Sequence, residues 1–211
     1  DEAVVRDPKT LAEVLRCALR AYPTGVLVEE FVAGTDVTVP FLEGRGDDGV
    51  LLPVDYLVDP SARSRFNLYD YRLKSAEANK VSVRCPPELP RDVIARLQAI
   101  SKVATRTLGI RDVGRVDFRL GEDGRIYLLE VNALPSLEHG ASLFAASGRE
   151  ALSYDETLQS IVESAARRQG LVVKPGARRR RPADPLRIGF TFNVKRVDTK
   201  GGNDSEAEYD A

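Results

Sequence analysis

The 211-residue sequence has no methionine, one histidine and only two cysteines, Cys17 and Cys85. Two cysteines so far apart in the sequence exclude a disulfide framework and a zinc knuckle, so a reducing compartment is the default expectation. The chain opens without a signal-peptide pattern. Because even position 1 is not methionine, we expect the chain to be a piece of a longer polypeptide.

An excess of charge of either sign is also missing, since 31 Lys and Arg residues face 32 Asp and Glu residues and the formal net charge is −1. This balance argues against general attraction to nucleic acid or to an anionic membrane surface, and we expect neither as a partner. No apolar run approaches the roughly 20 residues that cross a bilayer. The remaining composition is that of a globular protein with room for one large domain or two small ones.

The spacing of apolar residues predicts both helices and strands. Ser153 and Glu156 form a capping box at the start of one helix, and a glycine-rich turn at 121–124 joins two β-runs into a hairpin. The pattern favours an α+β fold with an antiparallel sheet flanked by helices. Expected helices cover 9–21, 91–108, 141–147 and 153–168, and expected strands cover 26–31, 36–42, 50–56, 81–85, 114–120, 125–132 and 187–193.

The hairpin carries the polar residues that point to chemistry. Arg115, Asp117 and Arg119 alternate along one strand and share a face, while Glu130 and Asn132 share a face of its partner. If the register joins these faces, two carboxylates, an amide oxygen and a guanidinium converge. Two neighbouring carboxylates repel unless a proton or a cation lies between them. An all-oxygen set beside an arginine suits Mg²⁺ with bound phosphate, whereas Zn²⁺ prefers His or Cys.

A simpler interpretation of the same hairpin is a solvated charged face, because charged residues are mostly exposed. Glu130 argues against it, since it follows the apolar run 126–129, which is predicted to be buried. A carboxylate at the end of such a run requires a partner. Both interpretations stay open on the pattern alone.

Residues 114–144, GRVDFRLGEDGRIYLLEVNALPSLEHGASLF, resemble the C-terminal signature of the ATP-grasp superfamily, within the D-alanine–D-alanine ligase-like group. Residues 26–39, VLVEEFVAGTDVTV, resemble that family's hinge, and residues 69–75, YDYRLKS, resemble its phosphate-contacting lysine loop. The resemblance covers roughly residues 1–170. It implies an ATP-grasp fold fragment, with the remainder of the central subdomain at 1–32 and the C-terminal domain at 33–170.

The resemblance implies a role for each matching residue in binding ATP. Glu29, with the backbone around Glu30 to Val32, would hydrogen-bond the adenine. Asp36 would accept hydrogen bonds from the ribose hydroxyls, and Lys74 would contact a phosphate.

It also implies a metal site on the β- and γ-phosphates. Asp117, Glu130 and Asn132 would hold Mg²⁺, for which Mn²⁺ is an alternative. Arg115, with Lys74, would stabilise the charge that develops on the transferring phosphoryl group.

The implied activity is ATP- and Mg²⁺-dependent carboxylate–amine ligation of amino-acid-like substrates through an acyl phosphate, with D-Ala as the leading substrate and the cytoplasm as the expected location. Phosphoryl transfer needs positioning and charge neutralisation more than a protein nucleophile, which fits a sequence without a Ser–His pair or a reactive Cys. Ser142 and the backbone of Leu143 would bind the carboxylate of the second substrate. Without the resemblance, Ser142 is expected to be a helix N-cap, and an ordinary exposed lysine is as good an interpretation of Lys74 as a phosphate contact. His139 could act as a general base, but an exposed loop histidine is the favoured interpretation.

The composition changes after Gly170. Residues 171–185 are rich in proline and contain four consecutive arginines, which predicts a solvated linker. Residues 186–211 resemble the start of a second ligase-like N-terminal domain. The expected partners are therefore the missing N-terminal part of the first unit and a tandem unit or a homodimer.

Two other functions compete with the ligase. One is a non-catalytic unit that binds nucleotide or only packs against its neighbour, and the other is a structural hairpin domain without a ligand.

Overall fold

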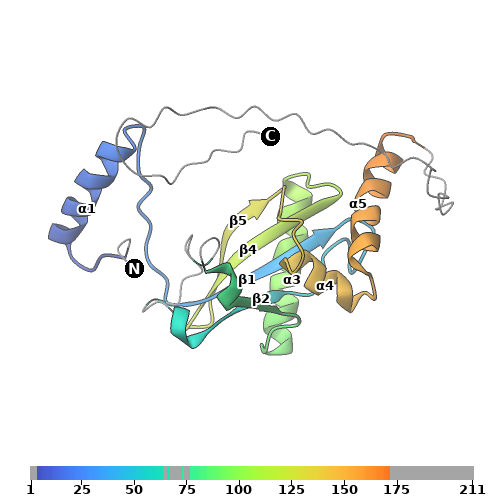
Figure 1. Ribbon diagram of the computed structural model, residues 1–211, viewed down its shortest axis with the longest axis horizontal. Coiled ribbons are helices and arrows are strands. Elements are labelled where there is room, and N and C mark those ends of the chain that lie inside the picture. The colour runs from blue at the N-terminus through green and yellow to red at the C-terminus, as the bar shows by residue number, and fades with distance from the viewer. Residues whose placement is uncertain (1–3, 64–65, 67–72, 74–76, 172–211) are drawn as a thin grey trace. The chain divides into compact units, whose positions relative to one another are not determined.

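The computed structural model describes residues 4–63, 66, 73 and 77–171. Figure 1 shows the arrangement of its helices and strands. The four expected helices and four of the expected strands lie within two residues of their predicted ends. The elements are α1 Pro8–Ala21, β1 Gly34–Leu42, β2 Val54–Val58, β3 Val81–Arg84, α3 Arg91–Thr107, β4 Val113–Gly121, β5 Ile126–Asn132, α4 Ser142–Arg149 and α5 Tyr154–Arg168, with 3-10 turns at Pro60–Ala62 and Ala78–Lys80.

The strands form one antiparallel sheet in the order β3-β2-β1-β4-β5. β1, β2 and β3 pair as an antiparallel meander. After α3, the chain adds the β4–β5 hairpin to the other side of β1, and the β1–β4 ladder runs from Gly34 opposite Gly121 to Leu42 opposite Val113. The predicted α+β fold with an antiparallel sheet is confirmed.

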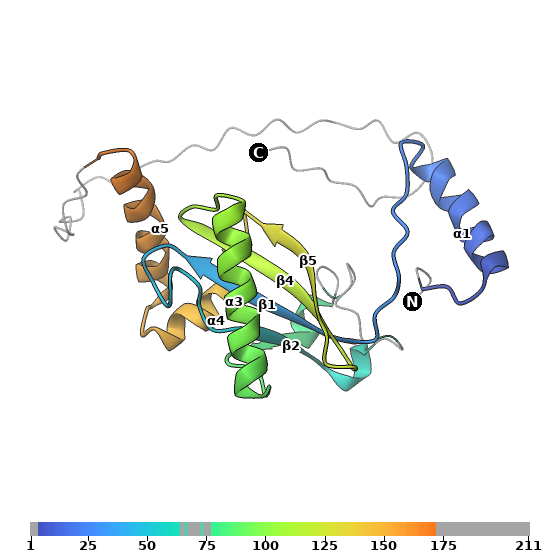
Figure 2. The ribbon, with the colours of Figure 1, turned by 180° about the vertical axis from the view of Figure 1, so that it is seen from behind.

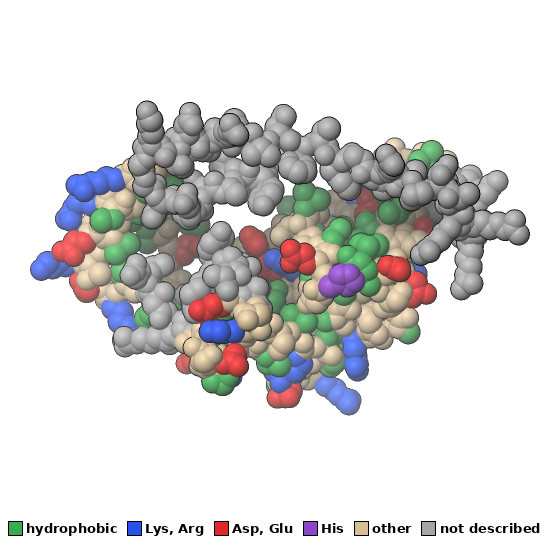
Figure 3. Space-filling view, in the orientation of Figure 1, with side chains coloured by type: hydrophobic (Ala, Val, Ile, Leu, Met, Phe, Trp, Pro, Cys, Tyr) green, Lys and Arg blue, Asp and Glu red, His purple; other side chains and the backbone are tan. Residues whose placement is uncertain are grey.

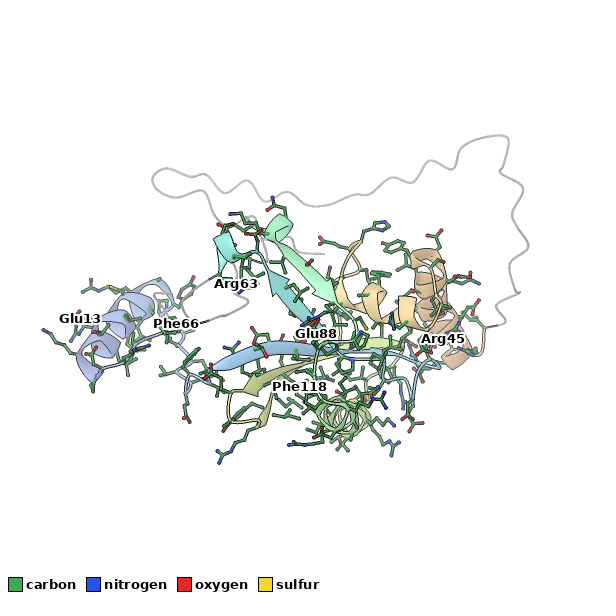
Figure 4. All side chains as sticks on the ribbon, turned by 90° about the horizontal axis from the view of Figure 1, so that it is seen from below. Glu13, Arg45, Arg63, Phe66, Glu88 and Phe118 are labelled. Carbon is green, nitrogen blue, oxygen red and sulfur yellow. The ribbon has the colours of Figure 1, made fainter. Side chains whose placement is uncertain are left out.

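The two faces of the sheet are covered by different helices (Figures 2 and 4). Alternate residues of β1 and β4, among them Val39 and Phe118, pack against Leu97 of α3 and are fully buried. On the opposite face, Leu42 at the end of β1 packs with Leu143 of α4. The period-2 pattern of the strands therefore feeds two separate apolar clusters.

Local sequence signals determine where two of the helices begin. Asp7 accepts hydrogen bonds from the backbone N–H groups of Lys9 and Thr10, and the helix α1 starts directly after it at Pro8. The predicted capping box is confirmed at α5, where Ser153 and Glu156 each satisfy the other's backbone N–H.

Among the described residues, no helix has both the length and the apolar character required to cross a membrane.

Two predicted strands require correction. Residues 26–31 form no strand with any described residue, and Leu27 is 80% exposed. Their β-propensity has no effect here because a strand needs a ladder partner. The strand predicted at 50–56 begins only at Val54, because Pro53 lacks an N–H group and Val50 makes only isolated bridges. The strand predicted at 187–193 lies outside the described residues, as do nearly all of the predicted linker and the predicted second unit.

Candidate active site

A β-bulge places Glu130 opposite Asp117. Strict alternation along β5 would leave Glu130 on the same face as Leu128, because these residues are two apart. The register shifts between Asp117 and Phe118, so that Phe118 pairs with Leu128 while Asp117 pairs with Glu130. Leu129 is the extra residue of the bulge. Glu130 is thereby turned to the face opposite α3. The register thus brings the carboxylates of Asp117 and Glu130 to the same face of the hairpin.

The guanidinium of Arg115 lies between the two carboxylates. Its Nε donates to Oδ1 of Asp117 at 2.7 Å and its Nη2 donates to Oδ2 at 2.6 Å. The same Nη2 is 4.0 Å from Oε1 of Glu130. The Thr38 hydroxyl of β1 donates to Oδ1 of Asp117 at 2.6 Å, which orients the carboxylate from the neighbouring strand. The arrangement supplies the cation that two opposed carboxylates need.

The environment keeps Arg115 and Asp117 ionised. Burial alone would raise the pKa of Asp117, but the hydrogen bonds and charge of Arg115, with the Thr38 hydroxyl, outweigh it and hold that pKa below its ordinary value. Burial would lower the pKa of Arg115, and Asp117 raises it above its ordinary value instead. The side chain of Glu130 is 62% exposed, so its carboxylate can be reached from solvent. The predicted burial of the run 126–129 is wrong, since Leu128 and Leu129 are 44% and 57% exposed, and that run therefore gives no argument against a solvated face.

The oxygen donors here fit Mg²⁺. Asn132 pairs with Arg115 across the hairpin, and its Oδ1 accepts the N–H of Leu134 at 2.9 Å, which fixes the amide. The described residues contain no cluster of three or more His, Cys, Asp and Glu side chains suited to a metal. A metal at this hairpin would therefore rely on two carboxylates, the Asn132 amide and oxygens from a ligand. Mg²⁺ is commonly held in this way, by one or two carboxylates together with substrate phosphates.

The residues expected to bind the nucleoside lie in and beside the segment that precedes β1. Glu29 and Glu30 are exposed. The Val32 carbonyl accepts from Nε of Arg119 at 3.0 Å, and Oδ1 of Asp36 accepts from Nη1 of Arg119 at 2.9 Å. Asp36 is thus held in an ion pair on the sheet, a contact that the sequence did not reveal. The alternating pattern of the strand places Arg119 only on the polar face of the hairpin, and no local pattern indicates its contacts with Val32 and Asp36.

The residues expected to bind the second substrate lie at α4. The N-cap expected at Ser142 is wrong: Ala141 is the N-cap, and Ser142 is the first helical residue and is buried. The Leu143 side chain belongs to the apolar cluster, so its backbone N–H is the group left to contact a ligand. His139 is exposed, as predicted, and its ring stacks on Tyr154 with centroids 3.8 Å apart (Figure 3, purple). Lys74 lies outside the described residues.

Comparison with known families identifies the chain. Residues 3–163 match the family model described as D-ala D-ala ligase C-terminus. The chain belongs to this family. It is thus a D-Ala-D-Ala ligase-like domain of the ATP-grasp type, as the signature at 114–144 predicted.

Relatives of the D-Ala-D-Ala ligase-like domain include two bacterial D-alanine--D-alanine ligases. The one from Methylibium petroleiphilum is 38% identical over 143 residues, which cover 67% of this chain and 42% of the relative. The one from Geobacter sulfurreducens is 35% identical over 136 residues, which cover 64% of this chain and 39% of the relative. The chain therefore spans less than half the length of these relatives.

Solved structures share the fold. The D-alanine--D-alanine ligase of Bacillus anthracis complexed with ATP superposes with a TM-score of 0.60 and 20% identity, covering 79% of this chain and 49% of that protein. D-alanyl-alanine synthetase A of Vibrio cholerae gives a TM-score of 0.60 and 20% identity over 76% of this chain and 47% of that protein. At this identity the likeness concerns the fold of the D-Ala-D-Ala ligase-like domain.

Proposed function

We propose that this D-Ala-D-Ala ligase-like domain is the metal- and nucleotide-binding part of an ATP-dependent ligase that forms C–N bonds between amino-acid-like substrates. The observation that supports the proposal best is the bulged hairpin, which brings Asp117 and Glu130 face to face around Arg115. A purely structural hairpin has no need for a bulge that turns a carboxylate toward another carboxylate. D-Ala is the leading substrate, because the relatives are D-alanine--D-alanine ligases.

The reaction that we propose has two steps. A carboxylate oxygen of the first substrate attacks the γ-phosphorus of ATP, and the bond from that phosphorus to the bridging oxygen of ADP breaks. The amine of the second substrate then attacks the acyl carbon, phosphate leaves and the amine loses a proton. Both steps need in-line positioning and charge neutralisation, which the polar face of β4 and β5 is suited to provide.

Each residue of the hairpin has a defined part in this proposal. Asp117, Glu130 and Asn132 would hold Mg²⁺, which when bound neutralises charge on the phosphate oxygens. The Thr38 hydroxyl keeps the Asp117 carboxylate in one orientation. Arg115 is already charged and buried in the site, so its guanidinium is in place to stabilise negative charge on the transferring phosphoryl group.

The remaining assignments concern the ends of the site. Glu29 and the nearby backbone would bind adenine, and Lys74 would bind a phosphate. The backbone N–H of Leu143, beside Ser142, would bind the carboxylate of the second substrate.

A cytoplasmic location follows from the use of ATP. The rest of the ligase unit would be supplied by sequence beyond this chain, since the chain spans less than half of its relatives. We place the C-terminal domain at 33–170 and a linker at 171–185, with a second unit starting at 186.

Release of phosphate from ATP by the natural-length protein tests the proposal. The assay contains Mg²⁺ and, in separate reactions, D-Ala, other amino acids and D-lactate. The double variant Asp117→Asn, Glu130→Gln removes the metal carboxylates, and Glu122→Gln, an exposed acid in the turn of the same hairpin, is the matched control.

We expect substrate-dependent release from the wild type and from Glu122→Gln, and at least a hundredfold slower release from the double variant. Tight ATP binding without release for any substrate would contradict ligation and favour the non-catalytic unit. Equal release from the double variant and the wild type would contradict the assignment of the metal site.

A further inference from the structure

Arg119 is a charged side chain in the interior of the domain. It follows Asp117 by two residues on β4 and lies on the same face, yet only 3% of its surface is exposed. A buried guanidinium is costly unless charged and polar groups surround it. Its partners therefore reveal which groups the fold has arranged around it.

Those partners come from separate segments of the chain. Nη1 of Arg119 donates to Asp36 on β1, the residue directly opposite it in the ladder, at 2.9 Å. Nε donates to the Val32 carbonyl at 3.0 Å, and Nη2 donates to the Phe66 carbonyl at 3.3 Å. The guanidinium carbon is also 5.9 Å from the centroid of the Phe31 ring, in cation–π range.

These contacts join the sheet to a segment without strand pairing. Residues 26–33 form no ladder with the described residues, and yet they carry the acids Glu29 and Glu30. The ring of Phe31 meets that of Phe66 edge-on, with centroids 5.3 Å apart. One planar guanidinium, with five donors in a fixed geometry, can bind three acceptors at once, which a lysine ammonium on a flexible stem cannot reproduce.

We propose that Arg119 is the positioning residue of the nucleoside end of the site, which rests on the proposed function above. It orients the Asp36 carboxylate and holds the segment 26–33 at a fixed place relative to Asp117. Two residues along a strand correspond to roughly 7 Å, so β4 itself sets the distance between the metal end and the nucleoside end. Arg119 acts through Asp36 and the Val32 backbone, and it takes no part in the transfer of the phosphoryl group.

The test replaces Arg119 in the natural-length protein. Arg119→Met keeps the length and apolar stem but removes every donor, whereas Arg119→Lys keeps the charge that faces Asp36. Arg125→Met is the matched control, because Arg125 lies on the same hairpin and its side chain is 76% exposed. Steady-state kinetics give KM for ATP and kcat, calorimetry gives the ATP affinity, and hydrogen exchange reports the backbone of residues 26–36.

We expect Arg119→Met to raise KM and Kd for ATP at least tenfold while kcat changes less than threefold, with faster hydrogen exchange at 26–36. Arg119→Lys should fall between the wild type and Arg119→Met, and Arg125→Met should match the wild type. If Arg119→Met does not fold, Arg119→Lys provides the test. In that variant KM for ATP should again rise more than kcat falls.

Three results overturn the inference. Unchanged ATP affinity in both Arg119 variants would show that Arg119 does not position the nucleoside, while leaving the proposed ligase intact. A loss of kcat as large as the loss of ATP affinity, together with a lower melting temperature, would show that Arg119 only stabilises the fold. A wild type that does not bind ATP would remove the proposed function and this inference together, and is thereby distinguished from a failure of Arg119 alone.

Discussion

Replacing Arg115 by methionine should destabilise the domain through the acidic pair that it neutralises. Arg115 makes a bidentate ion pair with Asp117 and also lies near Glu130. Methionine preserves much of the apolar stem and removes the charge. Asp117 then remains in a largely buried place with a second carboxylate directly opposite on β5.

The structure sets the size of this effect. The Arg115 and Asp117 side chains are only 16% and 18% exposed, so solvent screens their interaction weakly. Breaking a fully buried ion pair costs about 3–5 kcal/mol, and we expect about 2–3 kcal/mol here, because Glu130 and solvent can relax around the remaining charge. In a double-mutant cycle with Asp117→Asn, the coupling energy should be about 1.5–2 kcal/mol, because the second substitution removes the stranded charge.

Urea unfolding followed by far-ultraviolet circular dichroism measures these energies, and the absence of tryptophan makes this the practical probe. The matched control is the cycle for Asp123 and Arg125, a pair with the same spacing at the other end of the hairpin. Its side chains are 51% and 76% exposed, so its coupling should stay below about 0.5 kcal/mol. Equal coupling energies in the two cycles would show that burial does not strengthen the Arg115–Asp117 ion pair.

Three further predictions concern the core, a helix cap and acid stability. Leu97→Ala should lower the free energy of unfolding in the urea titration by about 3 kcal/mol, because Leu97 is fully buried. Its control, Val103→Ala on the exposed side of α3, should change that free energy by less than about 0.5 kcal/mol. Ser153→Ala should cost about 1 kcal/mol by removing the cap of α5, which a lower melting temperature in calorimetry would register. Because the pKa of Asp117 is below its unfolded value, its stabilisation is complete above about pH 4 and is lost as the pH falls through the folded-state value. The difference in unfolding free energy between wild type and Asp117→Asn should therefore shrink in acid, and a constant difference down to pH 2 would contradict the assigned shift.

Elements with a local signal were predictable from the sequence. The apolar stripe of α3, the glycine-rich turn of the β4–β5 hairpin and the capping box of α5 each depend on residues close together in the chain. The metal-site residues were found through a family signature carried by one hairpin. Their role as ligands stays a prediction.

Features that depend on pairing between distant segments were not predictable. The bulge at Leu129 has no signal in the alternating pattern, since only the register with β4 reveals it. Residues 26–31 have strand-like composition, but the described residues provide no partner strand. The contacts of Arg119 join residues that lie 83 and 87 positions away in the chain, so no local pattern identifies them.

Calorimetric titration of the natural-length protein with ATP, with and without Mg²⁺, tests whether the bulged hairpin binds the metal. We expect Mg²⁺ to strengthen ATP binding at least tenfold in the wild type and in Glu122→Gln. This gain should disappear in the Asp117→Asn, Glu130→Gln double variant. A gain of the same size in the double variant would contradict the assignment of the bulged hairpin as the metal site.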